Sequence, residues 1–227
     1  MSITTPDAQR TAFSSGAFLR VVNWHNTPAA ERGTLRSELA WYASRWDPVR
    51  PEDLDRLFET GQWHGTKPGF IPTFYDGYLN NFSVAAPVCD ELGLTAWFFP
   101  PTGFLSVPPE EQRAYADSHD IDLVEEEHGQ PALAMTWEHL EVISRRHTIA
   151  AHTAHHIQAR HCVTAEDAER EVLAPIRQIE AVTGRRPPAF AWLYGTPFDP
   201  DSVAGRAMLG AGIRYAVSNT AYQRIAD

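Results

Sequence analysis

Strand-like and helix-like runs alternate along most of this chain, and no other feature of the sequence constrains its fold as strongly. Residues 32–46, for example, carry Leu35, Leu39 and Tyr42 at helical spacing, whereas residues 18–24 are apolar and β-rich. The predicted strands cover residues 18–24, 69–74, 95–99, 148–151, 189–193 and 215–217. The predicted helices cover residues 32–46, 52–60, 80–92, 136–146, 164–183 and 202–209.

This alternation predicts an α/β fold with a parallel sheet, either open or closed into a barrel. In folds of this class, the chemistry gathers at the carboxyl ends of the strands. Four residues able to do chemistry lie at or just past predicted strand ends, namely His25, Asp76, His152 and Tyr194. We therefore expect these four residues to lie close together in space.

The size and charge of the chain exclude several classes of function. We expect a single domain over residues 1–227, with residues 1–16 as a flexible N-terminal segment. The net charge of −10 provides no basic surface for nucleic acid or for an anionic membrane. Because residues 1–16 lack the regions of a secretory signal, and no apolar run is long enough to span a bilayer, we expect a cytoplasmic protein. Cys89 and Cys162 are isolated, so we expect both to be buried without a disulfide.

Residues 105–134 interrupt the alternation. This segment is rich in aspartate and glutamate and shows little periodicity. We interpret it as a solvated surface insertion. The alternative is a lid over the site, or an acidic rim that selects a cationic ligand.

His152 and His156 form the most informative pattern in the chain. Histidines four apart on a helical turn project to one side, close enough for both imidazoles to hold one divalent ion, although ten histidines also allow chance adjacency. Asp76 adds a carboxylate at the point where a predicted strand gives way to a turn. Two imidazoles and one carboxylate leave coordination positions open for water and substrate, which is typical of a catalytic rather than a structural site.

Four segments resemble, in order, the motifs of one enzyme family. The run I-P-T-F-Y-D-G-Y at 71–78 resembles T-F-D-D-G-Y, and H-T-A-H-H at 152–156 resembles H-[ST]-x-x-H. The run T-W-E-H-L at 136–140 resembles T-W-x-x-L, and F-A-W-L-Y-G at 190–195 is similar to F-A-Y-P-Y-G. The family is that of the polysaccharide deacetylases, the NodB-homology domain of carbohydrate esterase family 4.

The resemblance implies a distorted TIM-like (β/α) barrel with fewer than eight units. It also implies a divalent metal ion, often zinc, bound by Asp76, His152 and His156. Members of the family cleave N-acetyl groups from sugars, or in some branches open C–N bonds in small cyclic amides. By the same resemblance, the backbone N–H of Tyr194 would face the oxyanion.

Two catalytic positions depart from the family pattern. Tyr75 stands where the family has its general-base aspartate, and a phenol, with a reference pKa of about 10, is a poor base at neutral pH. Tyr75 would instead donate a hydrogen bond to an oxygen at the metal or the carbonyl.

No histidine follows His161, so the family's late catalytic histidine is missing. One branch of the family, which includes exopolysaccharide N-deacetylases, is circularly permuted, and this chain resembles it. Members of that branch carry a histidine before the first motif, which replaces the late catalytic histidine. We assign this general-acid role to His25; the alternative is a structural histidine at a strand end.

The sequence also suggests positions for three aromatic residues and three further histidines. Three aromatic residues would offer flat faces to a sugar ring, or would belong to the core: Tyr78, Trp97 and Trp192. Three further histidines are expected at the surface: His147, His155 and His161.

Three functions follow from these interpretations. The first is a metal-dependent hydrolase that deacetylates an N-acetylated sugar or oligosaccharide. The second is a degenerate family member that binds metal or carbohydrate without turnover, and the third is a cytoplasmic hydrolase of cyclic amides or imides. The sequence leaves open the substrate, the metal identity and the oligomeric state.

Overall fold

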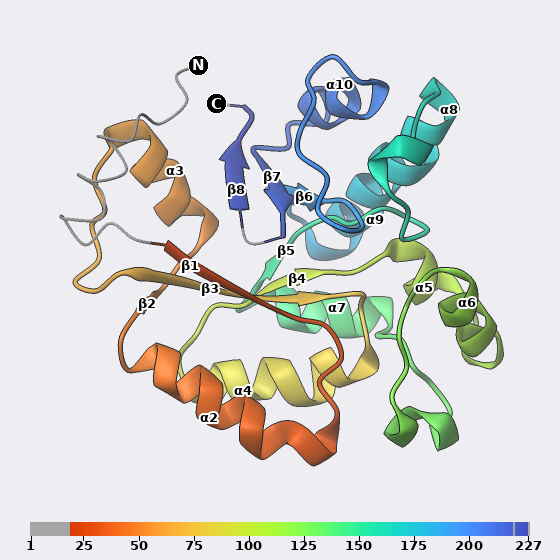
Figure 1. The fold of residues 1–227 in the computed structure, drawn as a ribbon, viewed down its shortest axis with the longest axis horizontal. Helices are drawn as coiled ribbons and strands as arrows, with labels where there is room; N and C mark the ends of the chain where they lie inside the picture. The colour runs from red at the N-terminus through yellow and green to blue at the C-terminus, as the bar shows by residue number, and fades with distance from the viewer. Residues whose placement is uncertain (1–18, 220, 227) are drawn as a thin grey trace.

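Five parallel strands form the main sheet of the protein in a computed structural model that describes residues 19–219 and 221–226 (Figure 1). They are β1 (Leu19–Trp24), β2 (Asp47–Pro48), β3 (Gly69–Tyr75), β4 (Trp97–Phe99) and β5 (Thr148–Ile149). The strand order is β1-β3-β4-β5, and β2 pairs with the beginning of β3. Residues 1–16, the expected flexible segment, lie outside the described residues.

A second sheet continues the curve of the first. It contains β6 (Ala189–Ala191), β7 (Tyr215–Ser218) and β8 (Ala221–Arg224), of which β8 is antiparallel to β7. A parallel bridge between Ala151 and Phe190 connects the two sheets, because Ala151 N–H donates to Ala189 O and Ala191 N–H donates to Ala151 O. Within residues 19–219 and 221–226, no pairing joins β8 back to β1. The expected α/β fold is confirmed, and it matches a distorted TIM-like barrel that stays open at this seam.

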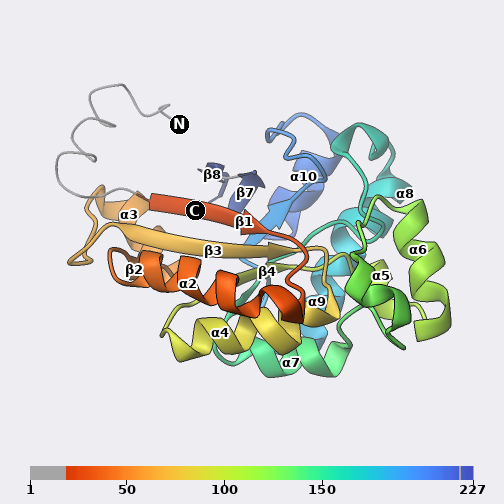
Figure 2. The ribbon, with the colours of Figure 1, turned by 60° about the horizontal axis from the view of Figure 1, so that its bottom comes forward.

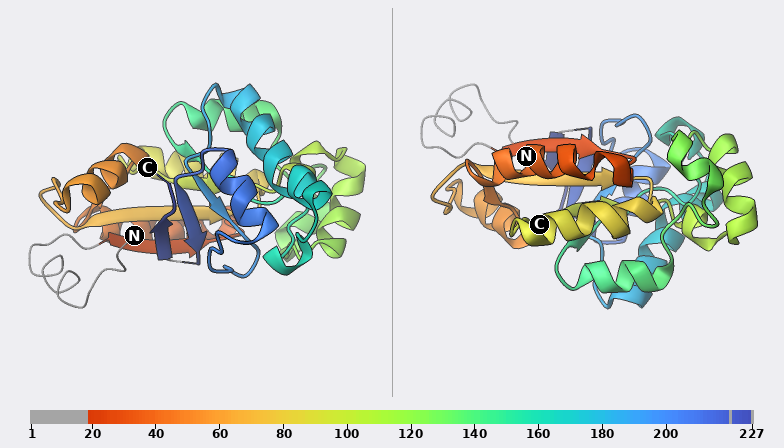
Figure 3. Two further views of the ribbon diagram at one scale, coloured as in Figure 1. Left: turned by 90° about the horizontal axis from the view of Figure 1, so that it is seen from above. Right: turned by 90° about the horizontal axis from the view of Figure 1, so that it is seen from below.

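Helices cover the outer face of the strands. Figures 1 and 2 show α2, α4 and α7 along one side of the main sheet, and Figure 3 shows α2 and α4 side by side. The α-helices are α2 (Arg32–Ala43), α3 (Pro51–Thr60), α4 (Ala86–Glu91), α5 (Thr102–Ser106), α6 (Gln112–Ser118), α7 (Trp137–Ser144), α8 (Ala165–Ala168), α9 (Ala174–Thr183) and α10 (Val203–Gly210). Shorter helical turns are Ala29–Glu31, Asn81–Ala85, Pro109–Glu111, Glu125–Gly129, Ala159–His161 and Glu169–Leu173.

The pleat of β3 separates two apolar cores. Phe70 and Phe74 face outward and belong to the large core between strands and helices. Ile71 and Tyr75 point to the opposite face and belong to a smaller core inside the curved sheet. This division follows from the period of two along a strand, and it explains why β3 is buried along its whole length.

Helix α3 packs against the inner core near the beginning of β7. Its Leu54 is fully buried there. The carboxylate of Asp55 accepts a hydrogen bond from the Tyr215 hydroxyl at 2.6 Å and forms an ion pair with Arg214. The interior of the open barrel is therefore filled by side chains at the end away from the carboxyl ends of the strands.

Most predicted elements form, with boundaries shifted by a few residues. The capping box predicted at Thr164 is present: Asp167 N–H donates to Thr164 Oγ1 at 3.1 Å, and Thr164 N–H donates to the Asp167 carboxylate at 2.9 Å. The long helix predicted over 164–183 is divided into α8 and α9 by the π-helical turn at Glu169–Leu173. Strand β8 and the short β2 were not predicted.

Residues 105–134 fold into short helical pieces and turns against the rest of the protein. Their apolar side chains form a small core with Tyr78, and its buried members are Tyr78, Phe104, Ala116, Ile121, Leu133 and Ala134. The segment lies next to the carboxyl ends of the strands, where α5 and α6 are drawn in Figure 1.

Two further sequence expectations concern cysteines and membrane spans. Cys89 and Cys162 are both buried and free, as predicted. Of the helices in the described part of the chain, none combines the length and apolar character needed to cross a bilayer.

Candidate active site

Four residues from the ends of different strands meet at one cavity of about 390 Å³. His25 follows β1, Asp76 follows β3, His152 follows β5 and Tyr194 follows β6. The register explains part of this arrangement, because Trp24 pairs with Phe74 and so places His25 beside Tyr75. The carboxyl ends of parallel strands thus gather these side chains, although they lie far apart in the sequence.

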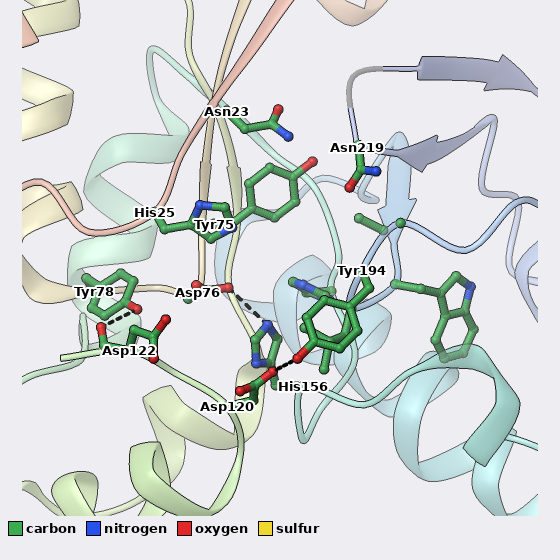
Figure 4. Close-up of a pocket in the computed structure, with 15 residues that line it drawn as sticks. Asn23, His25, Tyr75, Asp76, Tyr78, Asp120, Asp122, His156, Tyr194 and Asn219 are labelled. Atoms are coloured by element: carbon green, nitrogen blue, oxygen red, sulfur yellow. Dashed lines mark hydrogen bonds and ion pairs between the residues drawn. The ribbon is translucent and has the colours of Figure 1, made fainter.

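Asp76, His152 and His156 converge at the floor of the cavity. Their ligand atoms all lie within 4.8 Å of one another, and all three residues are buried. Nε2 of His156 lies 3.1 Å from Oδ1 of Asp76 (Figure 4). Burial lowers the pKa of His152, and the nearby His156 and His25 lower it further, so His152 is neutral as a metal ligand must be.

This donor set fits a divalent cation. Nδ1 of His156 lies 2.7 Å from the carbonyl oxygen of His119, which can only accept, so this nitrogen carries a proton. In the neutral ring, Nε2 then presents a lone pair to Oδ1 of Asp76, and this buried oxygen has no hydrogen-bond donor in that state. Burial lowers the pKa of His156, but Asp76 more than offsets this and raises it, because a proton on Nε2 would form a hydrogen bond and an ion pair with Oδ1. Two facing acceptors are stabilised by a cation between them.

The two histidines do not lie on a helical turn, and that prediction was wrong. The segment that follows β5 is a loop, and His156 has a left-handed backbone with φ of 52°. Ile157 N–H donates to Thr153 Oγ1 at 2.9 Å, so a side chain closes the turn where a helix would use a backbone carbonyl. The imidazole centroids are nevertheless 5.0 Å apart, which brings both rings to the same site.

Left-handed backbone conformations concentrate at this cavity. Among the described residues, five other than glycine have positive φ, and all of them line it: Asp76, Asp120, His156, Tyr194 and Asn219. Such conformations cost free energy and persist where the surrounding structure enforces them, typically at functional sites. The clustering supports this cavity as the candidate functional site independently of any motif.

Gly77 allows the turn that presents Asp76. It follows Asp76 with φ of 70°, and a Cβ at this position would lie 2.8 Å from Leu105 Cδ1 and 3.1 Å from Pro100 Cβ. The Asp76 N–H donates to the carbonyl of Phe99 at 3.2 Å. A residue with a side chain would therefore be strained in its backbone and crowded by its neighbours.

Tyr75 forms part of the wall of the cavity. Its ring stacks on Phe99 with centroids 4.7 Å apart, and its hydroxyl is buried and makes no hydrogen bond. Figure 4 shows the phenol directed away from Asp76 and His156. Burial raises the pKa of Tyr75, and the nearby Thr73 offsets this effect only in part. With its pKa raised, the phenol stays protonated at neutral pH and is a poor general base.

His25 is exposed at the mouth of the cavity. Its imidazole stacks on Tyr75, with centroids 5.5 Å apart and an interplanar angle of 27°. The ring nitrogens make no hydrogen bond to any described residue, so the alternative of a structural histidine with satisfied nitrogens is not what the geometry shows.

Comparison with known proteins identifies the family of the chain. A family model described as polysaccharide deacetylase matches residues 65–215, which is more than half of the chain. The chain belongs to the polysaccharide deacetylase family. No curated protein matches it in sequence.

Solved structures of polysaccharide deacetylases and related enzymes share this fold. The deacetylase PplD of Streptococcus pyogenes, solved with acetate, has a TM-score of 0.64 at 13% identity, with 86% of this chain and 80% of that chain covered. A de-N-acetylase from Aggregatibacter actinomycetemcomitans has a TM-score of 0.64 at 17% identity, with 92% and 91% covered. IcaB from Ammonifex degensii has a TM-score of 0.61 at 18% identity, with 91% and 88% covered.

The rim of this polysaccharide deacetylase site is acidic on one side. Asp120 and Asp122, from the segment 105–134, line the cavity, and the hydroxyl of the exposed Tyr194 donates to the Asp120 carboxylate. That hydrogen bond raises the pKa of Tyr194. The Tyr78 hydroxyl donates to the carbonyl of Asp122 at 2.7 Å. Sequence analysis identified the acidic segment but not these two residues, because nothing in its spacing shows which side chains turn inward.

One of the three predicted sugar-binding aromatics needs correction. Trp97 is fully buried in the inner core, where its indole N–H donates to Val49 O at 2.9 Å, so it does not touch a substrate. Tyr78 lines the cavity but is almost completely buried, and it serves to hold Asp122. Trp192 also lines the cavity and remains a candidate contact for a sugar ring.

The three histidines expected at the surface differ from one another. His161 is exposed, as predicted. His147 is buried, and its Nδ1 accepts from Ala96 N–H at 3.3 Å, so its surface placement was wrong. His155 is partly exposed, and its Nδ1 lies 2.8 Å from the buried Glu171 carboxylate.

Proposed function

We propose that this member of the polysaccharide deacetylase family is a metal-dependent hydrolase that removes acetyl groups from an N-acetylated sugar or oligosaccharide. The observation that carries the proposal is the convergence of Asp76, His152 and His156, with Oδ1 of Asp76 buried and facing Nε2 of His156 at 3.1 Å. Asp76 and the two imidazoles would hold a divalent ion, for which we propose zinc. When bound, such an ion polarises an amide carbonyl and lowers the pKa of water.

The residues around this centre have separate tasks in the proposed reaction. The acetamido group enters the cavity, and the backbone N–H of Tyr194 donates to its carbonyl oxygen as negative charge develops there. His25, at the mouth, donates a proton to the departing amine nitrogen. Because Tyr75 cannot accept a proton, His25 also takes the proton released as water attacks, and thus serves both transfers.

Acetate release tests this function. The purified protein, loaded with Zn²⁺, is incubated with N-acetylglucosamine oligosaccharides, and acetate and free amine are measured together. Equimolar release of both products, lost on chelation and restored by Zn²⁺, is the expected result. Stoichiometric Zn²⁺ binding without release of either product from any N-acetylated sugar would reject the proposal.

A second candidate function is binding without turnover, and the state of Tyr75 favours it. The family's general base is an aspartate, whereas here the position holds a phenol with a buried hydroxyl. The variant Tyr75→Asp separates the two candidates. Under the first, the variant gains little, because His25 already moves the proton. Under the second, an inactive parent becomes active by about 10²–10⁴-fold, the usual contribution of a positioned base.

A further inference from the structure

A buried carboxylate connects the segment 105–134 to the loop that carries His25. Glu127 is 5% exposed. Its Oε2 accepts from Asn26 Nδ2 at 2.6 Å and from Val124 N–H at 2.9 Å, and its Oε1 accepts from Asn80 Nδ2 at 3.2 Å. One side chain thus fixes three loops: the loop after β1, the loop after β3, and its own turn.

Two consecutive asparagines complete the connection to His25. Nδ2 of Asn80 donates to Asn26 Oδ1 at 2.6 Å, and Oδ1 of Asn80 accepts from Thr27 N–H at 2.9 Å. Nδ2 of the fully buried Asn81 donates to the carbonyl oxygen of His25 at 2.8 Å. The chain is therefore held through the backbone at His25 and Thr27 and through the side chain at Asn26.

The same connection reaches the Asp76 turn and the acidic rim. Asn80 and Asn81 follow Asp76 within five residues, so the loop that holds His25 is the loop that presents the carboxylate of the metal centre. Nδ2 of Asn26 also lies 3.3 Å from the carbonyl of Asp122, which accepts from the Tyr78 hydroxyl as well. Figure 4 shows His25, Asp76, Tyr78 and Asp122 on this side of the cavity.

His25 depends on such support from its backbone. Its imidazole is exposed and forms no hydrogen bond to the described residues, and its ring contact is the stacking on Tyr75. A histidine held by stacking alone can shift along the partner ring. Proton transfer requires heavy atoms to approach within about 3 Å, and misplacement by about 1 Å costs about 10²-fold in rate.

We propose that Glu127, acting through Asn26 and Asn80, is a positioning residue that sets His25 over the cavity for proton transfer. The inference rests on the proposed deacetylase function. A carboxylate suits this position because all three groups that face it are N–H donors, and ionised acceptors form the stronger hydrogen bonds. Glutamine at this position would direct an NH₂ group at another donor, which breaks the connection with almost no change in shape.

The variant Glu127→Gln tests the proposal by kinetics, with Glu125→Gln as the matched control. Glu125 belongs to the same turn, is exposed, and forms no hydrogen bond to the described residues. We expect kcat of Glu127→Gln to fall about tenfold with KM and bound Zn²⁺ unchanged, whereas Glu125→Gln keeps the parent kcat.

A double-mutant cycle with His25→Ala distinguishes positioning from general loosening. If Glu127 acts through His25, Glu127→Gln lowers kcat by less than about twofold in the His25→Ala background, because the group it positions is gone. A tenfold loss in both backgrounds would show an effect that does not pass through His25 and would overturn the proposal. An inactive but Zn²⁺-loaded parent would instead reject the proposed function.

A second measurement is independent of activity. The stacking of His25 on Tyr75 brings ring protons close enough for a nuclear Overhauser effect between imidazole and phenol. We expect this effect in the parent and in Glu125→Gln, and its loss in Glu127→Gln. Should Glu127→Gln fold poorly, Asn26→Ser removes the partly exposed amide from the same connection and carries the same expectation. An unchanged effect in a folded variant of either kind contradicts the proposal.

Discussion

Nε2 of His156 lies 3.1 Å from Oδ1 of Asp76, and that buried oxygen has no hydrogen-bond donor when the imidazole is neutral. The carbonyl oxygen of His119 lies 2.7 Å from Nδ1 of His156 and accepts a hydrogen bond from it, so the ring proton of the neutral imidazole is on Nδ1 and not on Nε2. The two atoms that face each other are therefore both acceptors when the ring is neutral. A buried pair of this kind calls for a cation, and the third ligand, His152, lies within reach of the same point.

Metal loading is expected to stabilise the fold. A ligand that binds the folded state alone contributes about 4 kcal/mol at a thousand times its Kd. In a chain of this size, about 1 kcal/mol shifts Tm by about 2–4 °C, so Zn²⁺ is expected to raise Tm by about 10 °C over the chelated protein. Calorimetry checks this, with His161→Ala as the control, because His161 is exposed and remote from the triad. Equal Tm with and without Zn²⁺ would count against a site in the folded chain.

Tyr75→Phe is expected to leave turnover almost unchanged. The hydroxyl it removes is buried and unpaired, so it has no part in proton transfer. Removing an unsatisfied buried hydroxyl is expected to stabilise the protein by up to about 1 kcal/mol, measured by urea unfolding. A fall in kcat of more than about tenfold would mean that the hydroxyl does reach the substrate.

Gly77→Ala and Gly33→Ala are expected to change stability in opposite directions. Alanine at 77 would have φ of 70° and would crowd Leu105 and Pro100, at a cost of about 1–3 kcal/mol. Alanine at 33 lies within α2, where a Cβ meets nothing within 4 Å, and is expected to contribute about 0.5–1 kcal/mol. Urea unfolding of both variants measures the two effects. Similar stabilities would show that the turn after Asp76 is not constrained as described.

Glu171 is expected to make the fold sensitive to acid. Burial raises the pKa of Glu171, but His155 and Arg170 more than offset this and hold it below its ordinary value. A carboxyl whose pKa is depressed on folding contributes stability above its unfolded pKa of about 4.3 and loses it as the pH falls through the folded value. Unfolding free energies from pH 7 to pH 3 should fall more steeply in the parent than in Glu171→Gln. Parallel curves would contradict this assignment.

Local patterns predicted the elements and the cluster of Asp76, His152 and His156, because both depend on short-range signals. The period of the apolar residues, together with capping residues and glycines, marks the strands and helices. The ends of the predicted strands identify Asp76 and His152. The turn at His156 was predicted wrongly, because Thr153 Oγ1 replaces the helical carbonyl and the backbone becomes left-handed. Trp97 was misplaced because it faces the inside of the barrel two positions before Phe99, the partner of Tyr75, and the sequence does not show how deep in the interior a buried strand residue lies.

Long-range contacts account for what the sequence missed. Asp120 meets Tyr194 across 74 positions, and Glu127 meets Asn26 across 101 positions. Neither pair has a spacing that a periodic pattern detects. The acidic composition of 105–134 was interpreted as a solvated surface insertion, with a lid or an acidic rim as the alternative. Which of its residues face inward depends on the packing of the segment around Tyr78.

Metal analysis of the parent and of Asp76→Asn tests the central claim most directly. Asparagine tolerates the left-handed backbone at this position and keeps the side-chain shape, but it lacks the charge. After loading with Zn²⁺ and dialysis, we expect about one ion per chain in the parent and less than about a tenth of that in the variant. Full loading of Asp76→Asn, or none in the folded parent, would contradict the account.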